Sequence, residues 1–183
     1  MKQNESMVMY VLRLAGTLFL IAAVVAVALA GVNSVTAPAI AELNAQKTQQ
    51  AIELVLPGGG EQLSEIPAVD LVSKVYASET GYAIEVTPGG FDNTITMMVG
   101  VDKAGSVLGI SIIKHTETAG LGAVAAAGTP AGESFRGQFV GASGSVSVTK
   151  DGGQMDAITG ATITSRAVCA GVNAALECAA QLG

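Results

Sequence analysis

The densest group of chemistry-bearing side chains lies between residues 156 and 165. It combines one acid, a turn of small and hydroxyl residues, and two further hydroxyls: Asp156, Thr159, Gly160, Ala161, Thr162, Thr164 and Ser165. A helical pattern begins here, and the unpaired N–H groups and positive dipole end of a helix can bind an anion such as a phosphate. Gly160 and Ala161 would leave room for that ligand beside the backbone. The alternative interpretation is a common helix start that Thr162, Thr164 or Ser165 caps.

A second polar segment follows a strand pattern that ends at Ile113. Its sequence is His115-Thr116-Glu117-Thr118-Ala119-Gly120-Leu121-Gly122. Taken alone, the segment predicts a surface histidine at a strand end. It also predicts that Glu117 is a solvated loop acid or caps the turn that follows.

Cysteine and histidine are too sparse to indicate a metal site. Cys169 and Cys178 are nine positions apart in one helical pattern, which corresponds to about 13.5 Å of rise. A disulfide needs Cα atoms within roughly 7 Å, so we interpret both as small buried apolar side chains. With His115 as the single histidine, we expect no zinc or haem site.

Composition and charge exclude two broad classes of protein. The 183 residues are 50% hydrophobic and 13% charged, which is not the composition of a disordered chain. The formal net charge is −6 and no cluster of Lys or Arg is present, so the sequence does not favour a nucleic-acid partner.

Residues 14–32 form an uncharged apolar run close to the length that crosses a bilayer, about 20 residues. It could be a cleaved secretory signal with a site at Ala28-Leu29-Ala30, or an uncleaved anchor in contact with membrane lipid. Signal-peptide apolar regions usually span about 7–15 residues, so the length favours a single-pass anchor in the cell (inner) membrane. Lys2 and Arg13 precede the run, which predicts a cytoplasmic N-terminus and an extracytoplasmic remainder.

The rest of the chain predicts an α+β fold, with an antiparallel sheet and packed helices behind one N-terminal transmembrane helix. Period-two runs separated by short glycine turns predict strands at 69–76, 82–87, 94–101, 106–113 and 145–149. Helical patterns span 36–56, a short segment within 118–130, and 165–182. The predicted divisions are an anchor over 1–35, a membrane-proximal helix and linker over 36–60, and a sheet domain over 61–183.

The segment from Asp156 to Thr162 resembles the flavinylation motif of the FMN-binding domain family. That motif reads Asp, two residues, Ser or Thr, Gly, Ala and Thr, and the chain matches it throughout. The resemblance implies that a flavin transferase joins FMN covalently to Thr162 by a phosphodiester, so that Thr162 is an attachment point and no catalytic residue is expected. The 61–183 domain would then be the covalent-FMN-binding domain.

The segment from His115 to Gly122 is similar to a second motif of the same family: His, any residue, Glu, Thr, Pro, Gly, Leu, Gly. Ala119 stands where the family has Pro. The resemblance implies that this loop lies along the isoalloxazine ring, with Thr118 and Leu121 as contacts. The cofactor-binding residues expected from both motifs are Thr162, Asp156, Thr159, Gly160, Ala161, Thr164, Ser165, Glu117, Thr118, Gly120, Leu121 and Gly122.

Within this family the chain resembles the G subunits of Rnf electron-transport complexes, which are related to the C subunits of sodium-translocating NADH:quinone reductases. The resemblance implies an electron carrier among the other subunits of a membrane redox complex, which couples electron transfer between ferredoxin and NAD to movement of Na⁺ or H⁺. The equivalent quinone-reductase component and a stand-alone flavinylated carrier are alternatives. A cofactor-free, membrane-tethered binding module is a further one, for which Thr162→Val would have no consequence.

Overall fold

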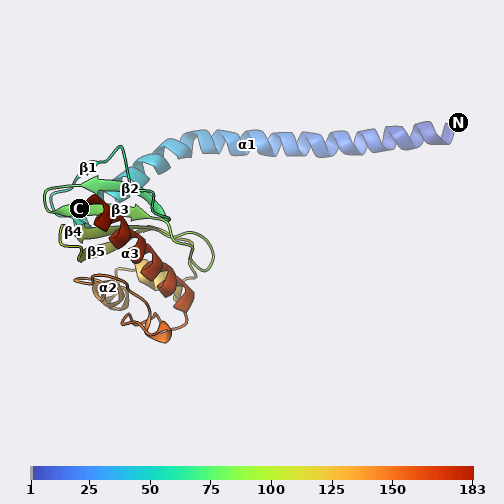
Figure 1. Ribbon diagram of the computed structural model, residues 1–183. Coiled ribbons are helices and arrows are strands. Elements are labelled where there is room, and N and C mark those ends of the chain that lie inside the picture. Colours follow the sequence, from blue (N-terminus) through green and yellow to red (C-terminus); the bar gives the residue numbers. More distant parts are fainter. Residues whose placement is uncertain (1) are drawn as a thin grey trace. The chain divides into compact units, whose positions relative to one another are not determined.

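The computed structural model describes the backbone of residues 2–183 and the side chains of residues 7–183. Lys2, which contributes to the predicted membrane orientation, has its side chain outside the described residues. Along the chain one helix is followed by five strands and then by further helical segments (Figure 1): α1 Lys2–Val55, β1 Glu61–Gln62, β2 Val72–Ala77, β3 Gly81–Val86, β4 Thr96–Asp102, β5 Val107–Lys114, the 3₁₀ helix η1 Gly122–Ala126, α2 Pro130–Gly137, the 3₁₀ helix η2 Thr149–Asp151 and α3 Thr162–Leu182. The predicted α+β class is confirmed.

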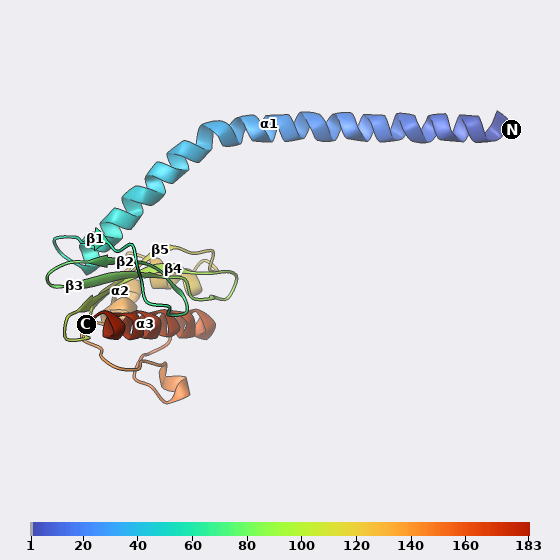
Figure 2. The same cartoon turned by 45° about the horizontal axis from the view of Figure 1, so that its top comes forward.

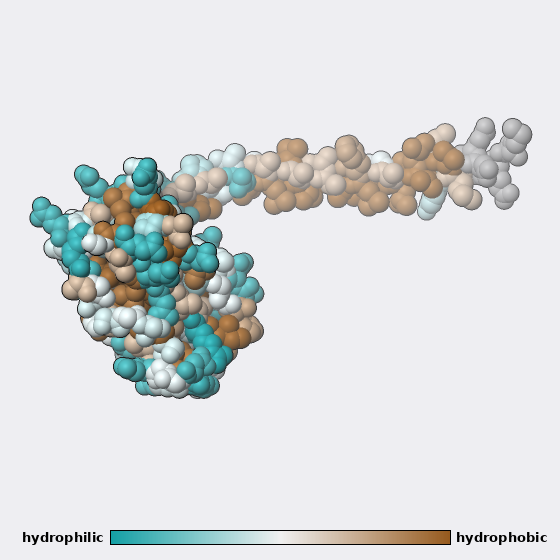
Figure 3. Space-filling model, in the orientation of Figure 1, coloured by the Kyte–Doolittle hydropathy of each residue, from teal (hydrophilic) through white to brown (hydrophobic). Residues whose placement is uncertain are grey.

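Helix α1 is long and apolar enough to cross a membrane. Its large apolar side chains between residues 7 and 35 are exposed, and they form the brown surface of this helix in Figure 3. The hydroxyls of Thr17, Ser34 and Thr36 donate to carbonyls three or four residues earlier in the helix. These bonds satisfy polar groups that would otherwise be costly in an apolar solvent. The chain separates into two compact units, residues 1–45 and 46–183.

The sheet is an antiparallel meander in the order β1-β2-β3-β4-β5. Short turns between neighbouring strands allow this arrangement. The predicted strands at 69–76, 82–87, 94–101 and 106–113 correspond to β2 through β5, with ends shifted by one to three residues.

The predicted strand at 145–149 is wrong. Val146 and Val148 are buried and alternate with more exposed residues, which imitates a strand pattern. The backbone instead closes on itself, because the N–H groups of Asp151 and Gly153 both bond the Val148 carbonyl at 2.9 and 3.0 Å. In the described part of the chain, the ladder contact of this segment is a single bridge from Val148 to Met155.

Helix α3 covers one face of the sheet and contacts β2, β3 and β4 (Figure 1). Val168, Val172 and Ala175 are fully buried in the core beneath it. Gly171 allows close approach, since a Cβ there would lie 3.0 Å from Met97 Sδ. Cys169 and Cys178 are buried free thiols on the same helix, as the sequence predicted.

The last turns of α1 cover the opposite face of the sheet (Figure 2). Ile52, Val55 and Leu56 pack against Ala83 and Met98, which alternate with the residues that face α3. All six residues of β3 are therefore buried. Contact is so close at Gly100 that a Cβ there would lie 2.1 Å from the Val55 carbonyl oxygen.

Two short helices, η1 and α2, follow β5 in the sequence and contact each other. The short helix predicted within 118–130 corresponds to η1, whereas α2 was not predicted from the sequence. Arg136 of α2 donates to the carbonyls of Ala125 and Ala127, at 2.7 and 3.0 Å, and so holds the end of η1. Phe135 and Phe139 make an edge-to-face contact in the core.

Candidate functional site

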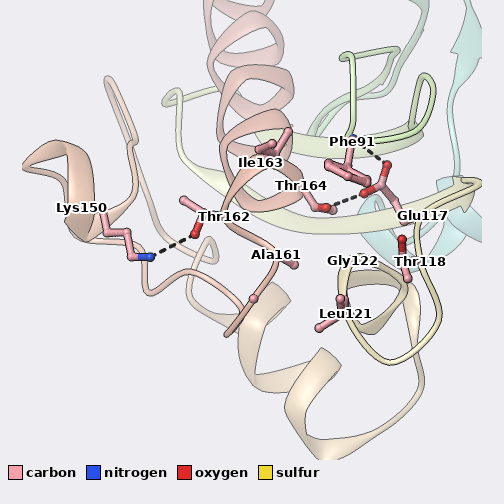
Figure 4. Close-up of a pocket in the computed structure, with 11 residues that line it drawn as sticks. Phe91, Glu117, Thr118, Leu121, Gly122, Lys150, Ala161, Thr162, Ile163 and Thr164 are labelled. Atoms are coloured by element: carbon pink, nitrogen blue, oxygen red, sulfur yellow. Dashed lines mark hydrogen bonds between the residues drawn. The ribbon is translucent and has the colours of Figure 1, made fainter.

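A cavity of about 270 Å³ lies where four segments of the chain meet (Figure 4). The segments are the turn between β3 and β4, the loop after β5, η2 and the beginning of α3. The residues that line it are Phe91, Glu117, Thr118, Leu121, Gly122, Lys150, Gly160, Ala161, Thr162, Ile163 and Thr164. Both segments that the sequence singled out therefore contribute to one cavity.

Glu117 is the buried polar centre of this site, with 7% of its surface exposed. Its Oε1 accepts a hydrogen bond from the Phe91 N–H at 2.9 Å, and its Oε2 accepts one from the Thr164 hydroxyl. The carboxylate thus ties the turn after β3, the loop after β5 and the start of α3 together. The interpretation of Glu117 as a solvated loop acid is wrong, because the partners that bury it come from distant segments.

Two glycines make space for the Glu117 carboxylate. A Cβ at Gly90 would lie 2.2 Å from Oε1, and a Cβ at Gly122 would lie 2.5 Å from Oε2 and from Thr164 Oγ1. Real Cβ atoms do not approach oxygen this closely, so any larger residue at either position would displace the carboxylate. Gly90 was not among the residues expected from the sequence.

The start of α3 carries no side-chain cap, which corrects the prediction that Thr162, Thr164 or Ser165 provides one. Each hydroxyl is engaged elsewhere. Thr164 donates to Glu117, and Thr162 Oγ1 accepts from Lys150 Nζ at 3.1 Å. Ser165 accepts from the Ile158 N–H and donates to the Ala161 carbonyl, both at 3.0 Å.

The first-turn N–H groups of α3 are consequently left without a capping side chain at the cavity wall. The N–H groups of the first helical turn have no partner inside a helix. Thr162 and Thr164 belong to that turn and line the cavity, beside the Lys150 ammonium (Figure 4). The combination of open N–H groups, positive helix dipole and one ammonium suits a singly charged phosphate group.

The residue next to Lys150 in η2 is paired with α3. Asp151 accepts two hydrogen bonds from Arg166, at 2.7 and 2.6 Å. The hydrogen bond from Arg166 holds the pKa of Asp151 below its usual value, and the same bond raises the pKa of Arg166. Lys150 was not predicted from the sequence, since an isolated lysine in a Gly-rich turn carries no signal of its own.

The remaining wall of the cavity is apolar and partly open to solvent. Phe91, Leu121 and Ile163 come from three different segments and are 64%, 42% and 49% exposed. Large side chains with this exposure suit the face or edge of a flat aromatic ring. Gly160 has a left-handed φ of 77°, and a Cβ there would lie 3.0 Å from Leu121 Cδ2. Phe91 and Ile163 were also missed, because neither lies in a recognisable motif position.

Four of the residues expected from the motifs do not line the cavity, and they are Asp156, Thr159, Gly120 and Ser165. Asp156 is exposed, and its backbone N–H and carbonyl bond the Gln138 side chain at 2.7 and 3.3 Å. Ser165 is buried behind the helix start.

His115 was expected at the surface. It is half-buried, and its Nδ1 has no hydrogen-bond partner among the described residues.

The arrangement fits a flat ring with a phosphate tail better than a metal ion. Among the described residues no three His, Cys, Asp or Glu side chains are grouped closely enough to hold a metal. Glu117 is the one carboxylate that lines the cavity, and both of its oxygens already accept hydrogen bonds.

Comparison with known proteins gives a consistent family. Residues 90–177 match the model of the FMN-binding domain. The chain is 34% identical to the G subunit of the Na⁺-translocating ferredoxin:NAD⁺ oxidoreductase complex of Acetobacterium woodii, over 91% of this chain and 90% of that protein. It is also 34% identical to the G subunit of an ion-translocating oxidoreductase complex of Methanosarcina acetivorans, over 88% and 90% of the two chains.

A third relative, the corresponding G subunit of Vibrio vulnificus, is 42% identical over 54% of this chain and 48% of its own. These relatives and the apolar helix α1 support a membrane-anchored protein. The chain belongs to the family of G subunits of ion-translocating oxidoreductase complexes, and it contains that family's FMN-binding domain.

Proposed function

We propose that this chain is an electron-carrier subunit that holds FMN covalently, through a phosphodiester on Thr162. The observation that carries the proposal is the position of Thr162, in the uncapped first turn of α3 and on the wall of the cavity. A hydroxyl here can be bonded to a phosphate that the helix N–H groups then stabilise. The favourable interaction with the helix dipole contributes about 0.3–1 kcal/mol.

The rest of the cavity would hold the isoalloxazine ring. Leu121 and Ile163 provide apolar contacts, and Thr118 provides a hydroxyl beside them. FMN supplies the electron-transfer chemistry when bound, and the protein orients and tunes it. Glu117 and Thr118 would tune the flavin midpoint potential through local charge and hydrogen bonds. Replacing either one and measuring that potential tests this role, which an unchanged value would exclude.

The partners follow from the names of the relatives. We infer that the chain relays electrons among the other subunits of an ion-translocating ferredoxin:NAD⁺ oxidoreductase complex, after a flavin transferase has attached the cofactor. A component of a quinone reductase and a stand-alone carrier remain alternatives. Helix α1 would contact membrane lipid, and Arg13 before its apolar run supports a cytoplasmic N-terminus and an extracytoplasmic flavin domain.

The decisive experiment is the intact mass of the full chain after co-production with an active flavin transferase. The proposal requires a gain equal to FMN less one water, absent in Thr162→Val, which preserves side-chain shape. Thr116→Val is a matched control, because Thr116 is exposed and does not line the cavity. If a known substrate of the transferase is labelled while this chain gains no mass, covalent attachment is excluded. A cofactor-free binding module would then be the better interpretation.

A further inference from the structure

Lys150 has a geometry that motif comparison does not explain. Its Nζ donates to Thr162 Oγ1 at 3.1 Å, across twelve positions of sequence. It is the only residue with a cationic side chain among those that line the cavity. In a chain with a net charge of −6, an ammonium group beside this particular hydroxyl is unlike the general surface charge.

The position of Lys150 is set by a second contact one turn along the same helix. Thr162 and Arg166 are four residues apart in α3, so they lie on one face of it. Lys150 donates to Thr162. Asp151 accepts the two hydrogen bonds from Arg166, at 2.7 and 2.6 Å. Adjacent residues of η2 therefore contact successive turns of α3, and the Asp151–Arg166 pair fixes where the ammonium lies.

The turn that carries these residues is itself tightly closed. The Thr149 N–H donates to the Met155 carbonyl at 2.9 Å. A Cβ at Gly153 would lie 2.0 Å from the Ser147 carbonyl oxygen, so the two sides of the loop touch. Gly152 ends η2 in the left-handed conformation with a φ of 84°. Lys150 thus extends from a short, closed turn, which limits where its ammonium can lie.

We propose that Lys150 binds the flavin phosphate at Thr162, with Arg166 and Asp151 as its positioning pair. The inference rests on the proposed covalent attachment. The donor would be a dinucleotide in which the FMN phosphate is held by an anhydride bond. Thr162 Oγ1 attacks that phosphorus, a new P–O bond forms, and the anhydride P–O bond breaks. Its electron pair leaves with the nucleoside monophosphate, which also takes up the hydroxyl proton.

Lys150 neither gains nor loses a proton in this sequence. Its ammonium first donates to Oγ1, which leaves the hydroxyl proton directed away from the lysine. It then donates to a phosphate oxygen and balances the single negative charge of the diester. Hydrogen bonds to charged groups are strong enough that losing one slows the reaction about 10- to 100-fold.

The test compares initial rates of mass gain for the full chain, with purified transferase and a saturating flavin dinucleotide. Lys150→Met should be slowed about 10- to 100-fold, and Lys150→Arg should recover most of the rate because it keeps the charge. Arg166→Gln should fall between them. Lys103→Met is the matched control, since Lys103 is remote from the cavity and lies over the Tyr82 ring in a cation–π interaction. Lys103→Met should react at the same rate as the chain without substitutions.

A second readout separates phosphate binding from recognition by the transferase. In the fully attached protein, the ³¹P resonance of the diester should move in Lys150→Met and remain in place in Lys103→Met. Unchanged rate and unchanged resonance in Lys150→Met would overturn the role of Lys150 while leaving attachment at Thr162 intact. If the chain without substitutions gains no mass, the attachment at Thr162, on which the inference depends, is overturned instead.

Discussion

Replacing Glu117 by alanine should destabilise the FMN-binding domain more than replacing an exposed acidic residue by alanine does. The substitution removes the acceptor for two hydrogen bonds and leaves the buried Thr164 hydroxyl without its partner. A hydrogen bond to a charged group contributes about 1.5–3 kcal/mol. The bond from the Phe91 N–H is partly exposed to solvent, so we count it at roughly half of that.

The sum is a loss of about 2–4.5 kcal/mol in the free energy of unfolding. In a domain of this size each kcal/mol lowers the melting temperature by about 2–4 °C, so the expected decrease is about 4–18 °C. Glu117→Gln keeps one acceptor for the Phe91 N–H and should lose less. The measurement is thermal unfolding of the detergent-solubilised full chain, followed by tyrosine fluorescence, since Tyr76 and Tyr82 lie on the strands of the sheet.

Glu79→Ala provides the matched control, because Glu79 is exposed in the turn between β2 and β3. It should change the melting temperature by less than about 2 °C. A shift for Glu117→Ala no larger than that of Glu79→Ala would refute the reasoning. It would mean that water replaces the carboxylate without cost, and that Glu117 does not hold the three segments together.

Three other results are expected. Gly100→Ala should lower the free energy of unfolding by about 2–4 kcal/mol, since the added Cβ would meet the Val55 carbonyl oxygen. A melting temperature unchanged from that of the parent chain would contradict this packing. Burial raises the pKa of Cys169 to about 11, so native protein at pH 8 should resist alkylation that unfolded protein undergoes, as measured by mass. The hydrogen bond from Arg166 lowers the pKa of Asp151 in the folded protein. The contact is therefore complete above the unfolded pKa of about 3.9, and it is lost only as the pH falls further, through the lower pKa of the folded state. An NMR titration of the Arg166 Nε–H should show that loss, and a resonance that stays constant down to pH 2 would contradict it.

The strands and the last helix could be predicted because their signals are local. Alternation of apolar and polar residues between glycine turns indicates a strand, and the apolar stripe of period 3.6 along α3 indicates a helix with one buried face. Prediction failed where local pattern and tertiary contact disagree. Val146 and Val148 alternate as in a strand, yet they are buried by a closed loop rather than by a ladder of neighbouring strands. The start of α3 was placed three residues late, because Thr162 looked like a cap and is the first helical residue.

The sequence also could not show that both faces of the sheet are covered. Ala83 and Met98 alternate with the core residues as surface positions would, and only the packing of Ile52 and Val55 against them makes them buried. The need for glycine at position 100 was hidden for the same reason, since a side chain there is excluded only by the approach of the Val55 carbonyl. A contact between elements so far apart in the chain leaves no periodic signal.

By itself, the sequence determined the fold class, the apolar helix and the two short motifs that identify the family, because each depends on residues adjacent in the chain. Only the tertiary structure decided how the site is assembled. Glu117 is buried because Phe91 and Thr164 reach it from 26 residues before and 47 residues after. Lys150 donates to Thr162, and the adjacent Asp151 is paired with Arg166 of the same helix. Such contacts depend on the packing of whole elements, which no local spacing encodes.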